Sequence, residues 1–146
     1  MTITLRPITR DNVRESVGLR TSEEQKNFVA ENGMSIAQAY TDPILIPRAV
    51  YADDIMVGFV MYGRDAETTV DWIIRVMIDA RYQSQGYGRA AMRELIAQLS
   101  QQPDCKEIRL SFVPDNVVAE RLYASLGFER TGEVEDDEII MCLHVK

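Results

Sequence analysis

Cysteine, histidine and tryptophan are scarce in this chain of 146 residues, which has two cysteines, one histidine and one tryptophan. The cysteines, Cys105 and Cys142, are too few for a disulfide framework and lack the CxxC spacing of a zinc site. We therefore expect no metal and a reducing, cytoplasmic environment. A chain of this length buries enough surface to fold without such links.

Long apolar runs are also absent. No segment approaches the roughly 20 apolar residues of a membrane span, and the first residues lack the basic stretch and apolar core of a signal peptide. The formal charge of −7 disfavours binding to nucleic acid or to an anionic membrane and favours a cationic small molecule. With 46% hydrophobic and 27% charged residues, the composition predicts one globular domain over residues 1–146.

The pattern of apolar and polar residues predicts a strand followed by helices in the first third of the chain. Alternation over residues 3–8 is typical of an edge strand. Residues 22–25 have the spacing of a capping box, and Asn32-Gly33 would end the helix that follows. A second box at 35–38 predicts one more helical piece, closed by Asp42-Pro43.

The remainder of the chain alternates strands and helices. The run at 69–78 is nearly continuous in apolar residues, which is typical of a central strand covered on both faces. The other predicted strands are 48–52, 56–62, 106–113, 128–134 and 139–145, and the helices are 88–99 and a segment that begins near Asn116 and stops at Gly127. The order βααβββαβαββ predicts an α/β or α+β domain with a mixed sheet.

A polar loop lies between the predicted central strand and the next helix. The loop consists of Gln83, Ser84, Gln85, Gly86, Tyr87, Gly88 and Arg89. Glycines let backbone N–H groups turn inward, and a helix N-terminus adds partial positive charge, so this loop predicts a pyrophosphate site. The alternative is a glycine-rich turn that binds no ligand.

A dinucleotide site is a competing interpretation, because Gly86, Gly88 and Ala91 match the pattern G-x-G-x-x-A. That fingerprint normally follows the first strand of a βαβ unit and needs an acidic residue at the end of the next strand. Here several elements precede the loop, and Val113 ends the next strand, with Glu107 at its start. A nicotinamide-type site is therefore disfavoured.

Two ordered motifs resemble those of a known family. Residues 81–88 resemble the Q/R-x-x-G-x-G/A coenzyme A loop of the GCN5-related N-acetyltransferases, and residues 116–128 resemble the family's second signature, which contains Asn116 and Tyr123. The predicted element order also matches the family's over nearly the whole chain. Residues 59–63, Trp72 and 78–83 are most similar to bacterial spermine/spermidine N-acetyltransferases.

The resemblance implies a mostly antiparallel sheet flanked by helices and the use of acetyl-CoA as cosubstrate. The pantetheine arm would lie along Val76, Met77 and Ile78, and residues 84–89 would hold the pyrophosphate. Tyr123 would be the general acid that protonates the departing thiolate. Asn116 and Tyr123 are seven residues apart and share one face of a helix, where Asn116 would bind pantetheine or only cap the helix.

The acceptor site departs from the narrower family. Ile74 stands two residues after Trp72, where an acidic residue is typical. Candidate substitutes are Glu23, Glu24 and Asp71, which with Trp72 could line an amine pocket; the alternative is that the acids are ordinary solvated charges and Trp72 is a core residue. The acidic turn at 133–138 is interpreted as a solvated hairpin, or as a regulatory or dimer rim.

The sequence thus predicts transfer of an acetyl group from acetyl-CoA to a primary amine of a small cation, with a polyamine favoured. A protein or peptide amine, another small amine, and a noncatalytic coenzyme A-binding module are the alternatives. No covalent enzyme intermediate is required, because a neutral amine can attack the thioester directly. The oligomeric state is not defined by these patterns, although a homodimer would be usual for the family.

Overall fold

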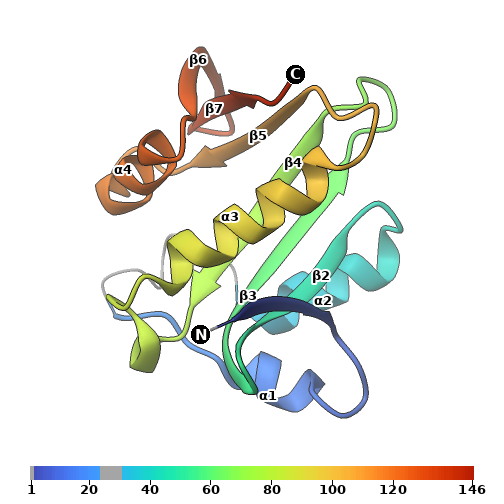
Figure 1. The fold of residues 1–146 in the computed structure, drawn as a ribbon, viewed down its shortest axis with the longest axis vertical. Helices are drawn as coiled ribbons and strands as arrows, with labels where there is room; N and C mark the ends of the chain where they lie inside the picture. The colour runs from blue at the N-terminus through green and yellow to red at the C-terminus, as the bar shows by residue number, and fades with distance from the viewer. Residues whose placement is uncertain (1, 24–30) are drawn as a thin grey trace.

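The computed structural model describes residues 2–23 and 31–146, and its elements follow the predicted order (Figure 1). The elements are β1 (Ile3–Pro7), α1 (Val13–Gly18), α2 (Asn32–Thr41), β2 (Ile46–Ala52), β3 (Ile55–Arg64), β4 (Asp71–Ile78), the 3₁₀ helix η1 (Ala80–Tyr82), α3 (Tyr87–Ser100), β5 (Glu107–Phe112), α4 (Val117–Ser125), β6 (Glu129–Glu135) and β7 (Glu138–His144).

The strands form one seven-stranded sheet in the order β1-β2-β3-β4-β5-β7-β6. Strands β4 and β5 pair in parallel, whereas the other neighbouring strands pair antiparallel. The predicted mixed sheet is therefore confirmed, and β4 is its central strand. The strands predicted at 48–52 and 56–62 form a hairpin that turns at Asp53-Asp54, since Ala52 pairs with Ile55.

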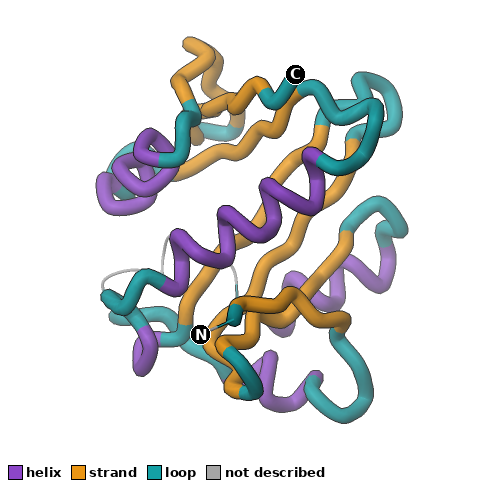
Figure 2. The backbone as a smooth tube through the Cα atoms, in the orientation of Figure 1, coloured by secondary structure: helices purple, strands orange, loops and turns teal. Residues whose placement is uncertain are grey.

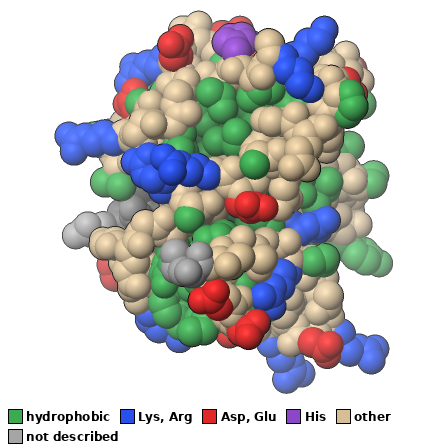
Figure 3. Space-filling model, viewed as in Figure 1, with side chains coloured by type: hydrophobic (Ala, Val, Ile, Leu, Met, Phe, Trp, Pro, Cys, Tyr) green, Lys and Arg blue, Asp and Glu red, His purple; other side chains and the backbone are tan. Residues whose placement is uncertain are grey.

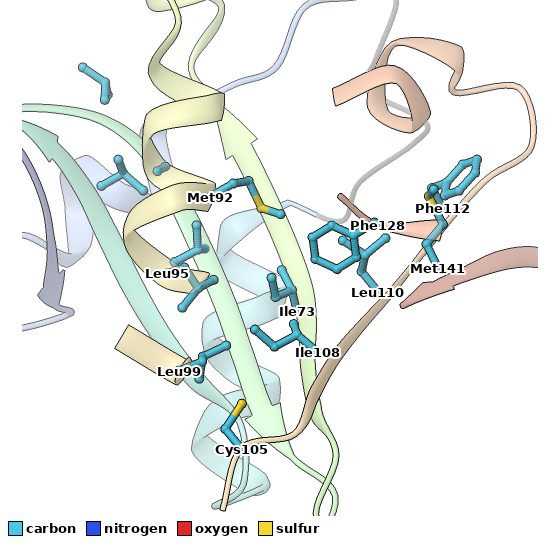
Figure 4. Packing of buried hydrophobic residues seen from close by; sticks show 14 of the residues in the cluster. Ile73, Met92, Leu95, Leu99, Cys105, Ile108, Leu110, Phe112, Phe128 and Met141 are labelled. Atoms are coloured by element: carbon cyan, nitrogen blue, oxygen red, sulfur yellow. The ribbon is translucent and has the colours of Figure 1, made fainter. Parts of the chain in front are cut away.

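Each face of the sheet is covered because its apolar residues need a partner layer (Figure 2). On one face, α3 buries Ala91, Met92, Leu95 and Leu99 at helical spacing. These side chains pack against residues of β4 and β5 that include Ile73 and Ile108 (Figure 4). A second cluster on the opposite face includes Leu19, Phe59, Met61 and Met77, and α1 and α2 cover that face.

The helix predicted to begin at residues 22–25 lies largely outside the described residues. Its predicted end at Asn32-Gly33 is wrong, because α2 begins at Asn32 and carries Gly33 in its first turn. Asn32 is buried, and its side-chain amide donates to the Ser16 carbonyl oxygen over 2.9 Å. The asparagine therefore ties α2 to α1 instead of stopping a helix. The other end is as predicted, since α2 stops at Thr41, directly before Asp42-Pro43.

The ladder between β4 and β5 is short. Only Asp71, Trp72 and Ile73 pair with β5, on residues Ile108–Leu110, although β4 continues to Ile78. The register of β4 against β3 shifts beside Ile74, which is the extra residue of a β-bulge. Beyond this point β5 leaves β4, as Figure 1 shows, and the backbone of β4 from residue 74 to 78 lacks a strand partner on that side.

Candidate active site

A pocket of about 530 Å³ lies along the open part of β4. Its lining comes from the end of β4, the loop after it, the first turn of α3 and one face of α4. It brings together most of the predicted coenzyme residues, namely Val76, Met77, Ile78, Gln83, Ser84, Gly86, Tyr87, Gly88, Arg89, Asn116 and Tyr123. Gln85 is exposed and does not line it.

The first turn of α3 forms one end of this pocket. Gly86 precedes the helix with φ of +84°, a left-handed conformation that strains any residue with a Cβ atom. The first helical hydrogen bond runs from the Ala90 amide to the Gly86 carbonyl, so the amides of residues 87–89 precede the helical ladder. Such amides and the helix dipole suit a phosphate group, so the pocket fits the pyrophosphate of a coenzyme.

Hydrogen bonds fix the loop that leads to this turn. The Gln83 side-chain amide donates to the Ile78 carbonyl oxygen over 3.0 Å, which joins the loop to the end of β4. Asp79 accepts from the backbone amides of Arg81 and Arg20 at 2.9 and 3.0 Å and from the Arg81 side chain at 2.8 Å. Burial of the carboxylate opposes ionisation, but these bonds outweigh it and hold the pKa of Asp79 below its usual value.

Helix α4 supplies the opposite wall. Asn116 caps it, because its side-chain oxygen accepts from the Ala119 amide over 3.2 Å. The Tyr123 ring packs beside Phe112 and Phe128, with centroids 6.3 and 6.2 Å away. Burial raises the pKa of Tyr123 to about 12, because the phenolate would lose its hydration. The phenol therefore stays protonated at neutral pH and can donate a hydrogen bond into the pocket.

A second pocket, of about 310 Å³, lies at the bulge of β4. Trp72 and Ile74 of β4 and Ser111 of β5 line it, together with four carboxylates, which are Asp65, Glu135, Asp136 and Glu138. Ser111 Oγ donates to Glu138 over 3.0 Å. These lining residues include no lysine or arginine, so the second pocket favours a cation.

The structure places the predicted acceptor residues in different surroundings. Trp72 lines the second pocket, whereas the buried Asp71 accepts from Arg64 at 3.0 and 2.8 Å. Glu23 is exposed and lines neither pocket, and Glu24 lies outside the described residues.

Sequence reasoning missed several lining residues. In the first pocket these include Thr21 and Ser22, which lie between α1 and α2, and Tyr82. In the second pocket they are Asp65, Ser111 and the acids of the β6–β7 turn. The acidic turn itself was a visible signal, but nothing in the local pattern linked it to Trp72.

The first pocket is thus lined by β4 residues 76–78, beyond the end of the β4–β5 ladder, and the second by Trp72 and Ile74, at that end. A family model described as "Acetyltransferase (GNAT) family" matches residues 10–128. The chain belongs to the GNAT acetyltransferases. This GNAT chain is 32% identical over 141 residues to the spermine/spermidine N(1)-acetyltransferase of Bacillus subtilis strain 168, covering 92% of this chain and 93% of that protein. The prediction of an N-acetyltransferase is thereby confirmed.

Solved structures show the same GNAT fold. An aminoglycoside acetyltransferase crystallised with coenzyme A superposes with a TM-score of 0.83 at 17% identity, covering 98% of this chain and 95% of that one. The spermidine N-acetyltransferase of Vibrio cholerae, in complex with coenzyme A and spermine, gives 0.78 at 16% identity, covering 97% and 95%. The helices among residues 2–23 and 31–146 are too short or too polar to cross a bilayer.

Proposed function

We propose that this GNAT protein transfers an acetyl group from acetyl-CoA to a primary amine of a polyamine, by direct attack and with Tyr123 as general acid. The observation that carries the proposal is the position of the two pockets on β4. Val76 lines the pocket with the anion-binding turn, and Ile74, two residues away, lines the pocket with four carboxylates. An anionic cosubstrate and a cationic acceptor can thus approach the same bulge from different sides.

The polypeptide supplies three functions to the proposed reaction. The amides before the α3 ladder hold the pyrophosphate, and the unpaired backbone of β4 hydrogen-bonds the extended pantetheine arm. A backbone N–H of this strand stabilises the oxyanion that forms on the thioester carbonyl. These groups are fixed before the substrate binds, so they lower the barrier without reorganising.

Proton transfers complete the step. The nitrogen lone pair of the neutral amine attacks the carbonyl carbon, and the carbon–sulfur bond breaks as its electron pair moves to sulfur. Tyr123 donates its proton to that sulfur. The attacking nitrogen releases one of its two protons to water as the amide forms, and this proton balances the one that Tyr123 regains from water. The acceptor ammonium, with an ordinary pKa near 10.4, first loses a proton to water in the acidic pocket. The carboxylates there hold the remote ammonium of the polyamine.

Two observations favour a polyamine over the alternatives. The acidic pocket suits several positive charges, and the Bacillus subtilis relative is named for spermine and spermidine. A peptide amine presents one charge and needs no such cluster. A noncatalytic module would not need the Tyr123 phenol in the lining of the first pocket. We also propose that residues 1–146 form one domain that acts in the cytoplasm.

The test measures thiol release from acetyl-CoA with spermidine, spermine, a short diamine, lysine, an aminoglycoside and a peptide amine. We expect release with the polyamines and a fall in kcat of about 10²- to 10⁴-fold in Tyr123→Phe. Tyr40→Phe, which alters a tyrosine 90% exposed on α2, is the matched control and should leave kcat unchanged. Turnover with only a peptide amine would reject the polyamine, and full turnover in Tyr123→Phe would reject the general acid.

A further inference from the structure

Three potential metal ligands meet on the sheet away from both pockets. Glu107 begins β5, and Cys142 and His144 lie near the end of β7. Glu107 pairs directly with His144, and Cys142 is two residues earlier on β7. Side chains two residues apart on a strand share a face, so all three side chains lie on the same face of the β5–β7 ladder. The intervening Ile108 and Leu143 belong to the core on the other face.

The donor atoms of this cluster are close together. Cys142 Sγ lies 2.9 Å from Glu107 Oε2 and 3.8 Å from His144 Nε2. The three ligand atoms all lie within 4.8 Å of one another. Tetrahedral zinc, with bonds of about 2.3 Å to sulfur and about 2.0–2.1 Å to nitrogen or oxygen, requires ligand atoms roughly 3.3–3.6 Å apart. The 3.8 Å contact with the imidazole lies just above this range, whereas the 2.9 Å contact lies below it, because it is a hydrogen bond from the thiol to the carboxylate. A metal that replaces the thiol proton would therefore move the sulfur and the carboxylate oxygen slightly apart.

The surroundings allow a cation to enter and remain. Cys142 is buried, whereas His144, the one histidine of the chain, is exposed, as the purple side chain of Figure 3 shows. Arg109 is the nearby positive group, and it is shared between two carboxylates, with contacts of 3.0 Å to Glu107 and 2.9 Å to Glu133. The second carboxylate balances the guanidinium, so Arg109 orients Glu107 as outer-shell partners commonly orient metal ligands.

We propose that Glu107, Cys142 and His144 bind a zinc-type divalent cation, with water as the fourth ligand. The mixed sulfur, nitrogen and oxygen donor set favours zinc or cobalt over magnesium or calcium, which prefer oxygen alone. On binding, the Cys142 thiol releases its proton to solvent and the thiolate forms the bond to the metal. The metal would join the start of β5 to the end of β7 and would take no part in acetyl transfer.

The sequence predicts no metal because the ligands are not close along the chain. Cys142 and Glu107 are 35 residues apart, and no short motif contains them. Strand pairing alone brings them together. The site is independent of the proposed function, because none of its three ligands lines either pocket.

Cobalt(II) provides a direct test, with the full chain and any affinity tag removed. The chain has only two cysteines and one histidine, so the sulfur and nitrogen ligands can be identified without ambiguity. We expect a thiolate-to-cobalt charge-transfer band in the near ultraviolet that disappears in Cys142→Ser. The matched control is Cys105→Ser, which removes the buried core thiol and should keep the band.

Zinc provides the second readout. The NMR signals of the single imidazole should shift on titration with zinc, and zinc should raise Tm in the wild type and in Cys105→Ser but not in Cys142→Ser. His144→Gln should weaken the cobalt affinity at least tenfold and leave kcat with acetyl-CoA unchanged. Absence of the band in folded wild type, or its survival in Cys142→Ser, would overturn the proposal.

Discussion

The two pockets on β4 are built from different parts of the polypeptide. The first depends on backbone groups, namely the unpaired edge of β4 and the amides before the α3 ladder. The second depends on side chains, because four carboxylates, an indole and a hydroxyl from separate segments meet beside Ile74. A backbone site is damaged by substitutions that change conformation, whereas a side-chain site is damaged by substitutions that change charge. The following variants separate these two kinds of damage.

Gly58→Ala should cause the largest loss of stability and should damage the first pocket. Gly58 pairs with Ile78, and a Cβ atom there would lie 2.4 Å from the Met77 carbonyl oxygen, which is backbone and cannot rotate away. Overpacking of this kind costs about 3 kcal/mol and would displace β4 beside the proposed pantetheine site. Urea unfolding and acetyl-CoA binding should both show the loss.

The control for this variant is Gly18→Ala. No atom lies within 4 Å of a Cβ built on Gly18, at the end of α1. Its free energy of unfolding should stay within about 1 kcal/mol of wild type. Equal destabilisation in the two variants would show that close packing against β4 is not the cause.

Gly86→Ala should weaken acetyl-CoA binding through backbone strain alone. Nothing lies within 4 Å of the added Cβ, but φ of +84° costs an alanine about 1–2 kcal/mol. If the loop relaxes to relieve the strain, the amides before α3 move and the KM for acetyl-CoA rises roughly tenfold. Steady-state kinetics with a saturating polyamine measures this effect.

Gly132→Ala is a matched control, because Gly132 has φ of +89° and equally open surroundings but lies in β6. It should lose similar stability and keep the KM for acetyl-CoA. A rise in that KM equal to that of Gly86→Ala would mean that strain anywhere in the chain, and not only at the turn of Gly86, weakens binding.

Glu135→Gln and Glu138→Gln test the second pocket. These acids face each other across the β6–β7 ladder, and like charges in this position repel. Each substitution should therefore raise the free energy of unfolding by about 0.2–1 kcal/mol. At the same time it should raise the KM for spermidine about two- to fivefold, because one partner of the cation is lost.

Glu67→Gln, at an exposed glutamate outside both pockets, should change neither quantity. The comparison between the pockets fails if Glu135→Gln raises the KM for acetyl-CoA instead of the KM for spermidine.

The smallest of the expected effects is that of Tyr123 ionisation on the pH dependence of kcat/KM. Because the pKa of Tyr123 is raised to about 12, the phenol keeps its proton well beyond its usual value near 10. The kcat/KM should therefore increase with pH as the amine loses its proton, and it should not decline before about pH 11. A falling limb below pH 10 that is missing in Tyr123→Phe would contradict the assignment.

The difference between the pockets also explains how far sequence reasoning reached. The lining of the first pocket is largely predictable from the sequence, because a site built from backbone groups requires glycine and a helix start, and Gly86 and Gly88 stand at the start of α3. Asp65 and Glu138 are brought to Trp72 only by the turns and ladders of the sheet, so their contribution required the structure. Strand and helix order was predictable from periodicity, whereas the role of Asn32 depended on its contact with Ser16.

Because only three residues of β4 pair with β5, the rest of β4 forms a sheet edge inside the molecule. Edge strands attract other extended chains and are a common starting point for aggregation. This edge runs beside a pocket whose other wall is α4, which stands between the unpaired backbone and any strand from a second molecule. At one of the two outer edges of the sheet, β1 ends at Pro7, whose nitrogen cannot donate to a neighbour. The unpaired N–H and C=O groups of β4 are therefore accessible to a narrow, extended ligand but not to a β-strand of a second molecule.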